Sequence, residues 1–140
     1  MDPSTTSAKK IIIIEDDDLI RQLFAGELKK AGFLVDDFAL GKLGLEALNQ
    51  NHYDLLLLDI MLPDLNGLAI LKDARQNVQN KDLRIVMLTN LGQDNVISES
   101  YKLGANGFLI KSSYTPEQII EEIKKMVSGT PPYNESSVSN

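Results

Sequence analysis

Acidic side chains gather directly after a run of four isoleucines near the start of the chain. The segment "IIIIEDDDLI" covers residues 11–20, and its acids are Glu15, Asp16, Asp17 and Asp18. Carboxylates this close repel one another, and a hard divalent cation relieves the repulsion because it prefers carboxylate, carbonyl and water oxygens as ligands. Acids at the end of an apolar strand therefore indicate a metal site. Mg²⁺ is the ion expected, with Mn²⁺ as a second candidate.

Three further apolar runs end in residues that suit related chemistry. Asp59 follows "DLLLL", Thr89 ends "RIVMLT", and Lys111 follows "GFLI". A lysine is a point charge on a long stem that suits carboxylate and phosphoryl oxygens, and threonine offers a hydroxyl donor. Acids with a metal, a lysine and a hydroxyl form a set that can hold a phosphoryl group on an aspartate.

The elements that must position these residues can be inferred from the apolar pattern. Three of the runs are continuous rather than alternating, which is typical of parallel strands covered by helices on both faces. The last amphipathic stretch opens with Thr115 as N-cap, Pro116 at the first helical position and Gln118 closing a capping box. The predicted strands are 10–15, 33–38, 54–59, 84–89 and 107–111, and the predicted helices are 18–30, 42–50, 67–78, 93–103 and 116–127.

Five strand–helix units in this order predict an α/β fold of the flavodoxin-like type. It is a three-layer, doubly wound, five-stranded parallel sheet with right-handed crossovers and five helices. Ligands of such sheets bind beyond the carboxyl ends of the strands. If the strand order is 2-1-3-4-5, the first and third strands are neighbours, and Glu15, Asp16 and Asp59 converge.

Composition narrows the class of protein. The chain has 140 residues, of which 43% are hydrophobic and 24% charged, which suits one globular domain at residues 9–128. We expect a flexible N-terminus at 1–8 and a flexible tail or truncated linker at 129–140. The net charge of -6 argues against direct binding of this domain to nucleic acid or a membrane surface. The absence of cysteine excludes thiol chemistry, and without a signal-peptide or membrane-spanning pattern a cytoplasmic location is predicted.

The motifs "IIIIED", "DLLLLDIMLPDLNGL", "IVMLTN" and "GANGFLIK" together resemble the receiver domain of two-component response regulators, over about residues 9–128. The resemblance implies that Asp59 accepts a phosphoryl group from a sensor histidine kinase or a histidine phosphotransfer protein. Such a domain catalyses only its own phosphorylation and dephosphorylation, so it is not expected to be an enzyme. It would signal to a downstream protein or to an output domain missing from this sequence, as a monomer or a phosphorylation-dependent dimer.

The resemblance also implies roles for single residues. Asp16, Asp59 and the backbone carbonyl of Met61 would ligate Mg²⁺, with Glu15 acting through water. Lys111 would pair with Asp59 and later with the phosphoryl group.

Two more residues would act on activation. Thr89 would bind a phosphoryl oxygen, and Phe108 would occupy the position of an aromatic side chain that switches between two arrangements.

The chain departs from the pattern of this family at several positions. Ser112 follows the lysine where many receivers have proline, and Asn90 follows Thr89 where a small residue is usual. We expect Asn90 either to crowd the path of the phosphoryl group or to hydrogen-bond to it. Met61 and Leu91 are apolar, and we expect them to exclude the attacking water and to lengthen the life of the phosphorylated state.

Other polar residues have structural interpretations. Asp18 fits the N-cap of the first helix, with Asp17 as a solvated charge of the first turn. The segment "LPDLNG" at 62–67 has the composition of a turn, in which Asn66 and Gly67 permit positive φ. His52, the single histidine, lies in a polar loop and is not expected to act in the site.

Three rival functions differ in the features they require. A phosphohydrolase of the haloacid dehalogenase type needs a second aspartate two residues after the first, where Met61 stands. A flavodoxin needs a hydroxyl-rich loop after the first strand, where the acids would repel a phosphate. A phosphorylation-independent interaction module on the receiver fold is not excluded by any residue.

Overall fold

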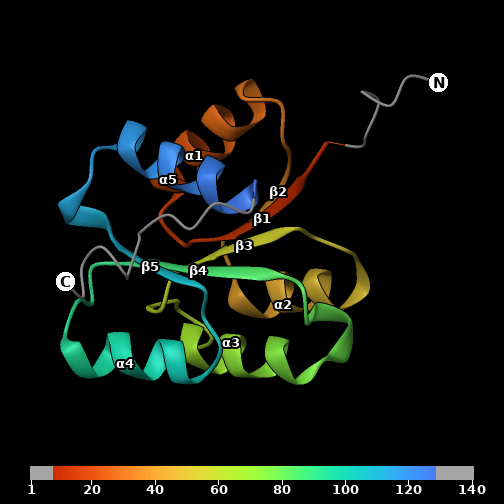
Figure 1. Ribbon diagram of the computed structural model, residues 1–140, viewed down its shortest axis with the longest axis vertical. Coiled ribbons are helices and arrows are strands. Elements are labelled where there is room, and N and C mark those ends of the chain that lie inside the picture. The colour runs from red at the N-terminus through yellow and green to blue at the C-terminus, as the bar shows by residue number, and fades with distance from the viewer. Residues whose placement is uncertain (1–7, 129–140) are drawn as a thin grey trace.

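The computed structural model describes residues 8–128 and shows a parallel sheet between two layers of helices (Figure 1). The strand order is β2-β1-β3-β4-β5, and each neighbouring pair is parallel. The predicted fold class is therefore confirmed. The expected flexible ends fall, except for residue 8, outside the described residues.

The elements agree with the predicted ranges to within two residues at each end, and two short 3-10 turns are additional. The strands are β1 (Lys10–Ile14), β2 (Leu34–Phe38), β3 (Leu55–Leu58), β4 (Arg84–Thr89) and β5 (Gly107–Ile110). The helices are α1 (Asp18–Lys30), α2 (Gly41–Gln50), α3 (Gly67–Gln76), α4 (Asp94–Lys102) and α5 (Pro116–Val127), and the 3-10 turns are η2 (Val78–Asn80) and η3 (Lys111–Ser113).

The four isoleucines of β1 are buried because both faces of the sheet are covered. Ile11 and Ile13 belong to the core that the sheet forms with α1 and α5. Ile12 and Ile14 belong to the core on the opposite face, which includes residues of α2 and α3. Each of the four is at most 1% exposed, and burial of an isoleucine contributes roughly 1.5–3 kcal/mol. The buried strand therefore holds the backbone from which the acids at its end project.

The start of α1 corrects one prediction. Asp17, not Asp18, is the N-cap: its Oδ1 accepts a hydrogen bond from the backbone N–H of Ile20 at 3.0 Å. The prediction was displaced by one residue because Glu15 Oε2 accepts the N–H of Asp17 at 3.0 Å, which holds Asp17 extended before the helix. At α5 the capping box of Thr115 and Gln118 is confirmed.

The start of α2 is capped by a residue distant in sequence. The N-cap residue Leu40 offers no side-chain hydrogen bond. Instead, the carboxylate of Asp64 accepts the N–H groups of Gly41 and Lys42 at 2.8 and 2.9 Å. The hydrogen bond from the Lys42 N–H is the largest cause that lowers the pKa of Asp64 below its usual 3.8. The loop between β3 and α3, which borders Asp59, is thereby tied to α2.

We expect Asp64→Ala to lower the melting temperature modestly at neutral pH. A carboxylate whose pKa is lowered by folding contributes stability above its unfolded pKa of 3.8, and this contribution is lost as the pH falls through the lower folded pKa. The melting temperatures of variant and wild type should therefore converge when the pH is lowered below 3.8. Asp82→Ala, at an exposed acid before β4, is the control and should leave the melting temperature nearly unchanged at neutral pH.

Asn66 and Gly67 do not use the positive φ that their residue types permit. Positive φ occurs between residues 8 and 128 at Gly32 and Gly104 only, so neither Asn66 nor Gly67 adopts it. Gly67 is instead required by close approach: a Cβ there would lie 2.2 Å from the carbonyl oxygen of Asp59. The glycine lets the start of α3 pack directly against the backbone of Asp59.

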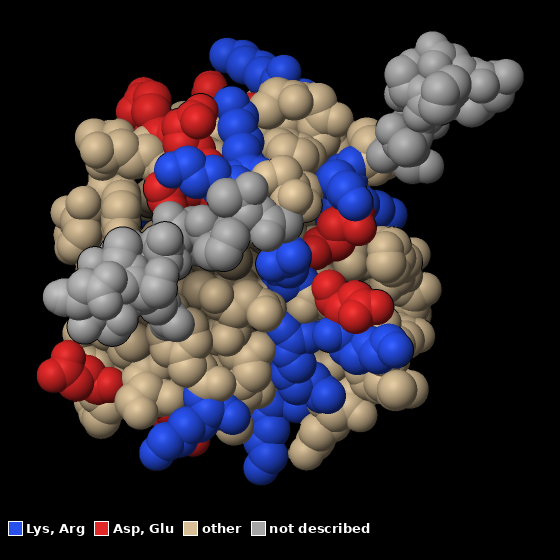
Figure 2. Space-filling model, viewed as in Figure 1, with Lys and Arg blue, Asp and Glu red and all other residues tan. Residues whose placement is uncertain are grey.

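The surface carries charge of both signs. On the face drawn in Figure 2, Lys and Arg are more numerous over the lower part, where α3 lies, and both signs mix near α1 and α5. On this face the positive and negative side chains are therefore unevenly distributed. Within the described part of the chain, no helix combines the length and the apolar character needed to cross a membrane.

Candidate functional site

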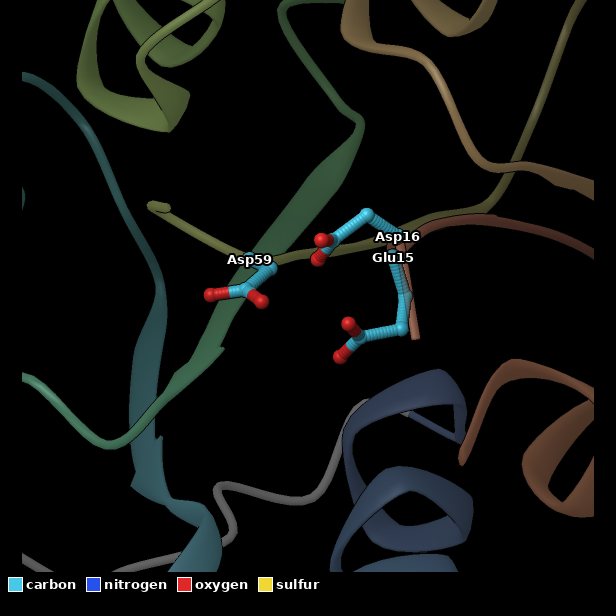
Figure 3. Close-up of side chains that lie close together, drawn as sticks. All are labelled: Glu15, Asp16 and Asp59. Atoms are coloured by element: carbon cyan, nitrogen blue, oxygen red, sulfur yellow. The ribbon is translucent and has the colours of Figure 1, made fainter. Parts of the chain in front are cut away.

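Three carboxylates meet at the carboxyl edge of the sheet. Glu15 and Asp16 follow β1, Asp59 follows β3, and these strands are neighbours with Ile14 beside Leu58. One carboxylate oxygen from each acid lies within 4.8 Å of the others, and Figure 3 shows the three groups approaching one another. Glu15 and Asp59 are 2% and 6% exposed, whereas Asp16 is open to solvent. The predicted convergence of the three acids is present in the structure.

Lys111 supplies the cation of this cluster. It follows β5 and reaches across β4 to place Nζ 2.5 Å from Glu15 Oε1 and 3.0 Å from Asp59 Oδ2. The contact to Asp59 is also a hydrogen bond that Lys111 donates. One ammonium group thus faces two buried carboxylates, which leaves an excess of negative charge once Asp16 is counted.

The pKa values of the buried groups reflect this balance. Burial is the largest cause that raises the pKa of Glu15, and the charge of Asp59 adds to it, while Lys111 and the Asp17 N–H act in the opposite direction. Burial alone would lower the pKa of Lys111, but its interactions with Glu15 and Asp59 together outweigh burial and raise it. The ammonium form of Lys111 is therefore held by its partners.

The donor set fits a hard divalent cation. All three groups offer carboxylate oxygens, the ligands that Mg²⁺ prefers. Glu15 Oε1, although it lies against the ammonium group, is buried and accepts no hydrogen bond of good geometry. An acidic triad with excess negative charge could thus hold a metal. The predicted ligand role of the Met61 carbonyl, and that of Glu15 through water, stay predictions.

Arg21, which the sequence analysis did not single out, holds the turn that carries the acids. Its guanidinium donates to the carbonyl oxygen of Glu15 at 2.9 Å, to Asp18 Oδ1 at 2.7 Å and to Asp37 Oδ2 at 2.8 Å. It therefore connects the end of β1, the start of α1 and the edge strand β2. Its place one turn after the acids, facing an acid in the next strand, is the signal that could have identified it.

Thr89 lies at the same carboxyl edge of the sheet as the acids, whereas Phe108 lies within β5, paired with Met87 of β4. Thr89 ends β4, is 1% exposed, and its hydroxyl accepts the N–H of Leu91 at 3.3 Å. Phe108 is half-buried in β5 and packs against the core on the side of α2 and α3. The switching roles predicted for both stay predictions.

A surface depression adjoins the acids. Its volume is about 650 Å³, and Asp16, Met61 and Leu91 are among the residues that line it. Met61 is 64% exposed, so its side chain lies at the opening and not in the core. Water that approaches Asp59 from this side would pass apolar side chains.

The Asn90 side chain has a definite partner. Its Oδ1 accepts the backbone N–H of Ser112 at 2.9 Å. Two of the positions at which the chain departs from the family pattern, Asn90 and Ser112, are therefore in contact. No cis peptide bond occurs between residues 8 and 128, so the bond between Lys111 and Ser112 is trans.

The comparisons with known proteins agree with this arrangement. The response regulator receiver domain family matches residues 11–124. The chain is similar to the solved chemotaxis protein CheY4 of Vibrio cholerae, with 27% identity, a TM-score of 0.79, and coverage of 85% of this chain and 98% of that one. A CheY-like receiver domain protein of Methanospirillum hungatei JF-1 is 27% identical with a TM-score of 0.81, over 88% and 96% of the two chains.

Among curated relatives, the transcriptional regulatory protein SrrA of Staphylococcus aureus (strain NCTC 8325) is 28% identical over 123 residues. The match covers 88% of this chain and 49% of SrrA, so the chain spans about half the length of that relative. The chain belongs to the response regulator receiver domain family. As a receiver domain, it is not a conventional enzyme.

Proposed function

We propose that the chain is a phosphoacceptor that receives a phosphoryl group on Asp59 and responds by a change of conformation. The observation that carries the proposal is the environment of Asp59. Its carboxylate is almost buried, shares the sheet edge with Glu15 and Asp16, and accepts a hydrogen bond from Lys111 at 3.0 Å. Few other functions need a buried aspartate that faces both an ammonium group and an acidic pair.

In the proposed reaction a carboxylate oxygen of Asp59 attacks phosphorus, and a new P–O bond forms while the P–N bond of a phosphohistidine breaks. The bonding pair stays on the imidazole nitrogen, which takes up a proton. Lys111 stands beside the attacking carboxylate and can stabilise charge on the phosphoryl oxygens. Mg²⁺ bound by Asp16 and Asp59 would supply further charge stabilisation.

The conformational response follows from the added charge. A phosphoryl group brings a charge of about -1.5 to -2 and strong acceptor oxygens. The Thr89 hydroxyl accepts from the Leu91 N–H, which leaves its own proton to donate to one of these oxygens as Thr89 moves towards Asp59. The loop before α4 would move with it, and α4 suits such motion because Ser100 is its single buried residue. We propose that Phe108 follows this loop, and that phosphorylation shifts a pre-existing equilibrium.

The test is incubation with acetyl phosphate and Mg²⁺, followed by intact mass measurement. We expect a gain of one phosphoryl group in the wild type and none in Asp59→Asn or in the presence of a chelator. Wild-type protein that gains no mass, or gains it equally in Asp59→Asn, would contradict the proposal. Binding of a partner that is indifferent to acetyl phosphate would favour the phosphorylation-independent module.

The partners proposed for this domain are a sensor histidine kinase or a histidine phosphotransfer protein as donor, and a downstream protein or an attached output domain as target. They rest on membership of the receiver family. We place the reaction in the cytoplasm, and we propose either a monomer or a dimer that depends on phosphorylation.

We expect Met61→Asn to speed the loss of the phosphoryl group several-fold. The variant replaces an apolar side chain at the opening of the depression with a carboxamide that can hold water near Asp59. The measurement is the decay of the phosphoryl label after the donor is removed. Val78→Asn, at another exposed apolar residue outside the depression, is the matched control and should decay like wild type. Equal decay rates in all three proteins would contradict the role of Met61.

A further inference from the structure

The loops that follow β4 and β5 are joined by one side-chain hydrogen bond. Asn90, the residue after Thr89, accepts the backbone N–H of Ser112, the residue after Lys111, at 2.9 Å across 22 positions of the chain. The loop after β4 also lies close to the end of β5 itself, because a Cβ added at Gly92 would lie 2.6 Å from Cδ1 of Ile110, the last residue of that strand. The segment after Thr89 is therefore packed against the segment that carries Lys111.

The turn that begins at Lys111 has few other means of support. It is the three-residue 3-10 turn η3, and none of its residues is buried. The N–H groups at the start of a helical turn have no partner within the turn. Asn90 provides the acceptor for one of them, at the residue adjacent to Lys111.

The placement of Lys111 depends on this turn. Its Nζ must lie within hydrogen-bond distance of Asp59 and against Glu15 at once, and both carboxylates are fixed by buried strands. A long lysine side chain loses rotamer freedom when it is held so. Motion of the turn would move the Cα of Lys111 and carry Nζ away from the two carboxylates. A hydrogen bond that restrains the turn is therefore more important here than beside a lysine that has no fixed partners.

We propose that Asn90 is a positioning residue for Lys111: its carboxamide holds the Ser112 N–H and so fixes the turn from which Lys111 reaches the two acids. The device requires a residue other than proline at position 112, because proline has no N–H to donate. The Asn90 oxygen is thus engaged by Ser112 in the structure, rather than free for the phosphoryl path. The effect on phosphoryl transfer rests on the proposed function above, whereas the placement of Lys111 does not.

The placement can be measured on the full chain without phosphate or metal. Hydrogen exchange followed by NMR reports on the Ser112 amide proton and the Lys111 ammonium protons. In Asn90→Ala and in Asn90→Leu, which keeps the bulk but not the acceptor, we expect both groups to exchange about two- to tenfold faster, the range that one lost hydrogen bond gives. Asn90→Asp keeps the acceptor oxygen and should retain slow exchange at both groups.

A second pair of variants isolates the hydrogen bond. Ser112→Ala keeps the main-chain N–H and should behave as wild type, whereas Ser112→Pro removes the donor. Lys111 exchange in Ser112→Pro should match that in Asn90→Ala, and the double variant should be no faster than either. With acetyl phosphate and Mg²⁺, Asn90→Ala and Ser112→Pro should also gain the phosphoryl group more slowly.

The results distinguish a failure of the positioning role from a failure of the proposed function. Unchanged Lys111 exchange in Asn90→Ala, fast exchange in Asn90→Asp, or effects that multiply in the double variant would each overturn the positioning role. A wild type that gains no phosphoryl group would overturn the proposed function, while the exchange rates would still decide whether Asn90 positions Lys111.

Discussion

Replacement of Gly67 by alanine is expected to destabilise the protein by about 3 kcal/mol or more, the upper part of the range for a forced steric overlap. An added Cβ would lie 2.2 Å from the carbonyl oxygen of Asp59 and 2.6 Å from the Cα of Ile60. Both atoms belong to the backbone, so no flexible side chain can turn away. The Gly67 N–H also donates to the Ile60 carbonyl at 2.7 Å, and this bond would be strained as α3 is pushed outward.

Urea unfolding of Gly67→Ala and wild type measures the effect. The backbone of Asp59 or Ile60 must shift to make room for the added Cβ. The variant molecules that remain folded should therefore also accept the phosphoryl group from acetyl phosphate poorly. Gly26→Ala is the matched control, because nothing lies within 4 Å of a Cβ at this exposed position inside α1. It should raise the free energy of unfolding by roughly 0.5–1 kcal/mol. An unfolding curve of Gly67→Ala that overlays that of the wild type would contradict this prediction, because it would show that the start of α3 can move away from the backbone of Asp59 without cost.

The sequence was sufficient to predict the sheet and the acid cluster because both follow from local patterns. Continuous apolar runs distinguish covered parallel strands, and the carboxyl ends of such strands share one edge. Once the order placed β1 beside β3, the meeting of Glu15, Asp16 and Asp59 followed. Lys111 could be included for the same reason, since it also ends a strand.

The polar contacts between loops could not be predicted in this way. Asp64 caps α2 from 23 positions away, and Arg21 donates hydrogen bonds to acceptors after β1, in α1 and in β2. Such pairs depend on the exact path of the loops, which no periodicity records. The N-cap of α1 was misplaced for a related reason, because the carboxylate of Glu15 reorganises the turn that follows it. Gly67 shows the same limit: its type was noticed, but the need for it is a contact with β3 rather than a backbone angle.

Lys111→Met should cost about 3 kcal/mol of stability in metal-free buffer at neutral pH, as expected when one partner of a buried ion pair is removed. Glu15 and Asp59 are almost fully buried, and the ammonium group lies against both. Methionine preserves the length of the side chain but leaves two buried anions facing each other. Lys124→Met is the matched control: its partner Glu121 is 3.2 Å away on the same helix with both side chains exposed, and such pairs contribute less than about 1 kcal/mol.

Two conditions should restore the Lys111→Met variant, and together they identify the cause of its instability. Mg²⁺ should stabilise it more than it stabilises the wild type, because the ion would neutralise the acids that the lysine no longer faces.

Low pH should also stabilise the Lys111→Met variant. The pKa of Glu15 is raised by folding, so its protonated form favours the folded state below its usual 4.5, and this advantage is lost as the pH rises through the raised value. Removal of Lys111 should extend this loss of stability to higher pH and make the dependence of stability on pH steeper. Thermal unfolding between pH 4 and 8, with Mg²⁺ or a chelator, measures both effects; if Lys111→Met matched Lys124→Met throughout, the ammonium group would not be what holds the acids together.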